Sequence, residues 1–220
     1  MKSIAIPFSG FYESEHNTAL DNALIQLCDI DGRGDFDPRL SGDDVQAING
    51  AVNWPAAFEH YARAYVDGAA QAICDQAGSD APPCGLVFDE LDSPREYNFA
   101  TDRIFCKVSD EFVAWLYEAT PPGCLAERVR ERFTSRDGFA SSYPSEVIEW
   151  PPLAEWDHNQ LGTLLEAWLG YEFGEVEGGY SSFTGRVWDN INDTSPSAAD
   201  EAIKSAMGEA GWTIINKLEG

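Results

Sequence analysis

The segment 85–108, GLVFDELDSPREYNFATDRIFCKV, holds the first residues whose types and spacing could do chemistry. Carboxylates crowd around two arginines in it, and such a loop could present paired charges to a ligand or substrate. Arginine also holds carboxylates in bidentate ion pairs that stabilise a hairpin. We predict structural ion pairs here, formed among Asp89, Glu90, Arg95, Glu96, Asp102 and Arg103. The alternative is an enzyme of unknown reaction, with a site near residues 89–103 that includes Tyr97.

A second group of acids follows, because residues 137–185 contain nine Asp or Glu and no Lys or Arg. Trp and Tyr side chains are interleaved with these acids. Two carboxylates flanked by aromatic rings are typical of glycoside hydrolases, but no pair among these acids stands out by its spacing. We therefore predict a partner-binding surface, made of Glu146, Glu149, Glu155, Asp157, Glu172, Glu175 and Glu177.

The overall charge is the strongest functional signal of the chain. Thirty-eight acids face 14 bases, which gives a net charge of −24. Such a chain repels nucleic acid and anionic membranes and attracts basic surfaces. The only basic cluster, Arg128, Arg130, Arg132 and Arg136, could be a nucleic-acid patch, but we expect it to bridge to the acidic bulk or to a partner subunit.

Motifs for metals, cofactors and nucleophiles give no convincing match. The loop 29–38 resembles an EF-hand, but Arg33 and Leu40 occupy two ligand positions, so we predict a surface loop with Asx turns. His16, His60 and His158 share no metal-binding spacing, and Asp157-His158 is expected to be a solvated pair at a helix start. The five cysteines form no C-x-x-C pair and predict reduced, mostly buried thiols. We expect no catalytic residue, metal or cofactor, and a cytoplasmic location, since neither a signal peptide nor a membrane span is visible.

Hydrophobic periodicity predicts a single α+β domain over residues 1–220. Strands are expected at 3–8 and 212–218, and a hairpin near 86–108, where residues 99–108 alternate in period two. Helices are expected near 17–28, 43–48, 53–74, 109–120, 124–133, 161–169 and from Ser195-Pro196 to Met207. Residues 172–185 are predicted to be turn-rich or strand-like.

The stretch SPREYNFATDRIF resembles segments of uncharacterised proteins from bacteriophages and prophages. In charge and size the chain also resembles phage antirestriction and anti-CRISPR proteins, some of which mimic DNA. That resemblance implies an acidic, phage-encoded inhibitor that binds the DNA- or RNA-binding site of a host defence complex, such as a CRISPR effector or a restriction enzyme. The partner would be a basic nucleic-acid-binding protein, with no direct nucleic acid or membrane contact. The third reading is a phage interaction protein whose acidity serves only solubility.

Overall fold

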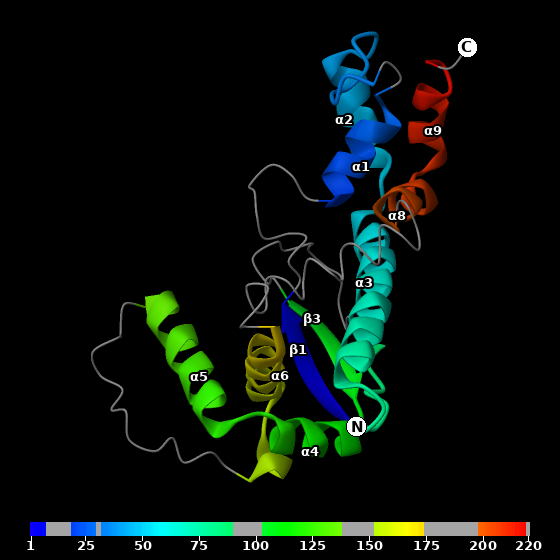
Figure 1. Cartoon of the computed structure of the whole chain (residues 1–220). Coiled ribbons are helices and arrows are strands. Elements are labelled where there is room, and N and C mark those ends of the chain that lie inside the picture. Colours follow the sequence, from blue (N-terminus) through cyan, green and yellow to red (C-terminus); the bar gives the residue numbers. More distant parts are fainter. Residues whose placement is uncertain (8–18, 30–31, 90–102, 138–151, 174–197, 219–220) are drawn as a thin grey trace. The chain divides into compact units, whose positions relative to one another are not determined.

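The computed structural model describes residues 1–7, 19–29, 32–89, 103–137, 152–173 and 198–218. These residues group into two compact units (Figure 1). Of the described residues, the first unit contains 1–7, 66–89, 103–137 and 152–173, and the second contains 19–29, 32–65 and 198–218. Helix α3 (Trp54–Ala77) contributes residues to both units. That the chain is one domain stays a prediction.

A three-stranded antiparallel sheet lies in the first unit, with strand order β1-β3-β2. It is built from β1 (Lys2–Pro7), β2 (Val87–Phe88) and β3 (Arg103–Val108). β2 and β3 form the expected hairpin, in which Val87 lies opposite Lys107. One face of β3 is buried through Ile104, Cys106 and Val108, as the period-two pattern predicted.

Helix α6 (His158–Phe173) packs along β1 and forms the centre of this unit. All nine residues of the predicted segment 161–169 are buried, which is typical of a helix covered on every side. Gly162 makes the close approach possible, since a Cβ atom there would overlap the carbonyl oxygen of Ala5. The helix is longer at both ends than its apolar run indicated.

Helices α4 (Asp110–Ala119) and α5 (Pro122–Asp137) both pack against α6. Ser109 caps α4, because its hydroxyl accepts a hydrogen bond from the backbone N–H of Phe112 at 3.1 Å. Helix α5 is longer than the predicted helix 124–133 at both ends. A short 3-10 helix, Leu153–Glu155, precedes α6.

The second unit is helical in its described residues. Helices α1 (Ala19–Leu27) and α8 (Ala198–Ala206) pack together, and α2 (Gly42–Ala51) packs on α9 (Glu209–Ile215). A capping box at Ser41 starts α2, since Ser41 and Asp44 each bond the other's backbone N–H.

The predicted strand at 212–218 is wrong, because this segment forms α9 and the turn after it. Gly211, Ile215 and Leu218 are buried at helical spacing, and a Cβ atom on Gly211 would meet Met207 and Ala51. Contact with α2 therefore outweighs the strand preference of Trp, Thr and Ile. The α+β class and the small antiparallel sheet are confirmed. Among the described residues, no helix has the length and apolar character needed to cross a membrane.

Candidate functional site

Asp89, the first acid of the predicted ion-pair set, forms an ion pair with a residue that the sequence did not single out. Lys107 Nζ lies 2.6 Å from Asp89 Oδ2, and Ser3 Oγ donates to the same oxygen at 3.4 Å. The strand register explains the contact, since Val87 lies opposite Lys107 and Asp89 is two residues further along the same face. This pair fastens the end of β2 to the central strand β3.

The other members of that set remain untested. Glu90, Arg95, Glu96 and Asp102 lie outside the described residues, as does Tyr97, and only the backbone of Arg103 is described. The enzyme alternative near residues 89–103 therefore also stays a hypothesis.

Three of the seven predicted partner-binding acids are described, and all three are exposed. Glu155 and Asp157 precede α6, whereas Glu172 lies in its last turn, about 20 Å further along the helix axis. Asp157 is a helix cap, because its Oδ1 accepts hydrogen bonds of 2.8 Å from the backbone N–H groups of Asn159 and Gln160. These three acids therefore do not form one cluster. Glu146, Glu149, Glu175 and Glu177 lie outside the described residues.

The pair Asp157-His158 is part of this helix start and not an acid–base dyad. The rings of His158 and Phe105 pack in a T-shaped arrangement with centroids 5.1 Å apart, and His158 Nε2 contacts Asn159 Nδ2 at 3.1 Å. The carboxylate of Asp157 meanwhile bonds backbone N–H groups.

Two exposed carboxylates, Asp75 and Glu172, lie where α3 and α6 end. Gln76 Nε2 of α3 lies 3.5 Å from Glu172 Oε2 of α6, so the last turns of the two helices are neighbours. Asp75 is exposed one residue earlier and accepts a 2.7 Å hydrogen bond from Gln71. We call Asp67, Asp75, Tyr171 and Glu172 the acidic edge.

The acidic edge combines negative charge with an aromatic side chain. Asp67 and Asp75 are both exposed and lie eight residues apart on α3, which places them about 12 Å apart along the helix axis. Tyr171 is 51 % exposed, one of the few large hydrophobic side chains so accessible among the described residues. Tyrosine is enriched among residues that dominate binding at protein interfaces.

Two of these acids oppose the helix dipole. The last turn of a helix carries partial negative charge, so a carboxylate there is unfavourable and a cation favourable. Asp75 lies in the last turn of α3 and Glu172 in the last turn of α6, and neither turn contains a basic residue. The sequence analysis missed Asp67, Asp75 and Tyr171, because the predicted helices 53–74 and 161–169 end before Asp75 and Glu172 and so do not place these acids in last turns.

The described Lys and Arg side chains of the first unit bind oxygen atoms of the same unit. Lys2 Nζ donates to the carbonyl oxygen of Ala154 at 2.7 Å, Lys107 binds Asp89, and the guanidinium of Arg128 binds Glu166 at 3.1 Å. The acids of the acidic edge form no ion pair with any described cation. Negative charge at the edge is therefore left uncompensated by the described part of the chain.

The contact between Arg128 and Glu166 is the most buried ion pair described in this unit. The Glu166 side chain is 6 % exposed and that of Arg128 is 32 % exposed. Arg128 thus joins α5 to the central helix α6, which confirms for this arginine the expectation that it bridges to an acid. The side chains of Arg130, Arg132 and Arg136 are not described.

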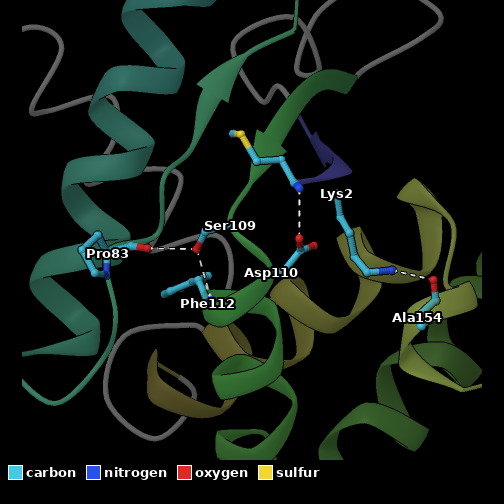
Figure 2. Close-up of polar contacts among 7 residues, drawn as sticks. Lys2, Pro83, Ser109, Asp110, Phe112 and Ala154 are labelled. Carbon is cyan, nitrogen blue, oxygen red and sulfur yellow. Dashed lines mark hydrogen bonds and ion pairs between the residues drawn. The ribbon is translucent and has the colours of Figure 1, made fainter.

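Figure 2 shows how Ser109 joins three segments of the first unit. Its hydroxyl donates to the carbonyl oxygen of Pro83 at 3.1 Å, and its backbone N–H donates to the carbonyl oxygen of Cys84 at 3.1 Å. Asp110 next to it binds the amino group of Met1 at 3.0 Å. Ser109 therefore fixes the chain that leads into β2 as well as the start of α4.

Carboxyl groups with perturbed pKa values lie in the second unit and have local causes. Backbone N–H groups of Arg33 and Gly34 donate to Asp29 and lower its pKa, which fits the predicted Asx-type loop. The Arg39 side chain lowers the pKa of the buried Asp37 through a bidentate ion pair. Among the described residues, no cluster of three His, Cys, Asp or Glu side chains could hold a metal ion.

An open hollow of about 330 Å³ lies between α1 and α2 in the second unit. It is lined by the apolar side chains of Leu24, Ile25, Phe36 and Val45 and by the polar side chains of Asp21, Gln46 and Asn49. The lining includes no residue of the two predicted sites.

Comparison of the chain with protein-family models, with curated proteins and with solved structures found no significant match. Any function must therefore be argued from the residues themselves.

Proposed function

We propose that this protein is an acidic inhibitor that occupies the nucleic-acid-binding site of a basic partner, without catalysis. The observation that carries the proposal is the acidic edge, where Asp75 and Glu172 are exposed in neighbouring last turns of α3 and α6 and the exposed Tyr171 precedes Glu172 in the sequence. The proposed target is the DNA- or RNA-binding channel of a host defence complex, such as a restriction enzyme or a CRISPR effector.

Carboxylates can stand in for phosphates in such a site. Proteins that bind DNA are held largely by Lys and Arg contacts to regularly spaced phosphate charges. Asp67 and Asp75 offer two charges about 12 Å apart on one rigid helix, and Glu172 adds a third from the neighbouring helix end. Tyr171, next to Glu172 in the sequence, supplies an exposed aromatic side chain comparable to the tyrosine anchors of other interfaces.

The position of Asp75 and Glu172 also supports a role in binding. Each opposes the local helix dipole and so reduces stability in the isolated protein. A cationic partner would remove this penalty on binding, because it neutralises the carboxylates. Residues that reduce stability in the free protein are common at functional sites.

Affinity columns carrying three proteins test the proposal: wild type, Asp75→Lys/Glu172→Lys, and the control Asp43→Lys/Glu111→Lys. The control changes the net charge equally, but its acids lie in the first turns of α2 and α4. A host-cell extract is loaded at low salt, and duplex DNA or RNA is then used for elution.

We expect one defined nuclease or effector complex to be retained by wild type and control, to be released by its own nucleic acid, and to pass through the Asp75/Glu172 column. Retention of the same basic proteins by all three columns would contradict the role of the acidic edge. That result would instead favour the alternative in which the acidity of the chain serves only solubility.

A further inference from the structure

Two cysteines of the first unit lie in contact. Cys74 in the last turn of α3 and Cys84 before β2 place their Sγ atoms 3.1 Å apart. Cys84 is buried, whereas Cys74 is partly accessible. A disulfide needs sulfur atoms about 2.05 Å apart, so a shift of about 1 Å would join them.

The polypeptide around both cysteines is held in place. Ser109 fixes Pro83 through its hydroxyl (Figure 2) and Cys84 through its backbone N–H, as described above. Gly85, with a φ of +61°, turns the chain immediately afterwards, where a Cβ atom would lie 3.4 Å from Ser109 Cβ. Cys84 Sγ also lies 3.7 Å from the carbonyl oxygen of Ala70 in α3. Cys74 is therefore positioned by helix α3, and Cys84 by its hydrogen bonds and contacts with Ser109 and Ala70.

We infer that Cys74 and Cys84 form a redox modification site, which closes to an intramolecular disulfide when the protein meets a small-molecule disulfide such as oxidised glutathione. The bond would tie the last turn of α3, which carries Asp75 of the acidic edge, to the strand β2. This inference does not depend on the proposed function.

The reaction proceeds by two thiol–disulfide exchanges. The accessible Cys74 sulfur attacks oxidised glutathione, which breaks its S–S bond, releases one glutathione and leaves a mixed disulfide on Cys74. The Cys84 sulfur then attacks the Cys74 sulfur, and its proton passes to the departing second glutathione. Two protein thiols are oxidised, and one glutathione disulfide is reduced to two thiols.

The order of the two steps follows from the surroundings of the thiols. Burial raises the pKa of Cys84 to about 11, so this thiol is a poor first nucleophile at neutral pH. Cys74 is exposed enough to meet the oxidant. The remaining cysteines serve as controls, since Cys28 and Cys106 are buried and Cys124 is partly accessible.

The test treats the folded chain with oxidised glutathione, blocks remaining thiols with iodoacetamide, and digests it with a protease that cleaves before aspartate. Cleavage before Asp67, Asp75, Asp80 and Asp89 places the two cysteines in separate peptides, 67–74 and 80–88. Mass spectrometry then detects a link between them. Cys84→Ser and Cys124→Ser are treated in parallel.

We expect the linked peptides in more than half of the wild type and of Cys124→Ser, and their loss on reduction. Cys84→Ser should instead carry one glutathione on Cys74. The inference is overturned if both thiols of the wild type are recovered alkylated. It is also overturned if Cys74 stops at the glutathione adduct while Cys84 is alkylated, or if Cys124 reacts in preference to Cys74.

Discussion

Replacing Asp75 and Glu172 with lysine exchanges two unfavourable charges for favourable ones at the ends of α3 and α6. A charge in the last turn is worth about 0.3–1 kcal/mol, so reversing its sign changes stability by about twice that at each site. Loss of the contacts with Gln71 and Gln76 costs about 0.2–0.5 kcal/mol each. The free energy of unfolding should therefore rise by about 1–3 kcal/mol.

Thermal unfolding at low salt, followed by circular dichroism, measures this change. For a protein of this size, about 1 kcal/mol corresponds to about 2–4 °C in Tm. The control Asp43→Lys/Glu111→Lys places cations in first turns, where acids are favourable, so its Tm should fall.

Both double variants remove the same amount of the net charge of −24. A rise of equal size in both would mean that overall repulsion, not the helix ends, determines the result. A lower Tm of the Asp75/Glu172 variant would refute the reasoning outright. Molar salt should shrink the difference between the variants, because it screens exposed charges.

Three further predictions concern buried contacts. Arg128→Met should lower the free energy of unfolding by about 2–3 kcal/mol in urea titrations, because it leaves the buried Glu166 carboxylate without its partner. Gly162→Ala should cost at least about 2 kcal/mol in the same assay, since its Cβ atom would overlap the carbonyl oxygen of Ala5. The pKa of Asp37 is lowered in the folded state, so its contribution to stability is present above about pH 3.9 and is lost as the pH falls through the folded-state pKa. Urea midpoints between about pH 2 and pH 5 should therefore vary less steeply in Asp37→Asn than in wild type.

Each of these has a matched control. Arg63→Met removes an exposed ion pair with Glu59 and should change stability by less than about 0.5 kcal/mol. Gly170→Ala lies on α6 with open space around the added Cβ atom, and should be neutral or stabilising. Asp80→Asn removes one exposed loop carboxylate and serves as the control for Asp37→Asn. Equal effects of a variant and its control would contradict the structural reason given for it.

Local patterns in the sequence predicted much of the fold. Alternation in residues 99–108 identified β3, because one face of a strand is buried and the other is not. The predicted helix 109–120 agrees with α4, because Ser109 can cap a helix start and Pro121 disfavours its continuation. The strand prediction for residues 212–218 was wrong because their helical state depends on contact with α2, which no local pattern reveals.

The candidate site was less predictable. Sequence reasoning grouped Glu155, Asp157 and Glu172 by composition. Helix α6, however, separates Glu172 from the other two acids by about 20 Å along its axis. Asp75 and Glu172 are 97 residues apart in the chain, and only the tertiary contact between Gln76 and Glu172 makes their helix ends neighbours. The contact of Cys74 with Cys84 is more local, but without C-x-x-C spacing it also required the structure.

The most direct test of nucleic-acid mimicry is a competition titration with the partner recovered from the columns. Affinity of that partner for wild type should fall steeply between about 50 and 200 mM salt. Its duplex DNA or RNA ligand should displace the protein completely, and Asp75→Lys/Glu172→Lys should bind more than tenfold more weakly than Asp43→Lys/Glu111→Lys. A ternary complex in which the partner holds nucleic acid and this protein together would contradict the account, as would equal weakening by the two double variants.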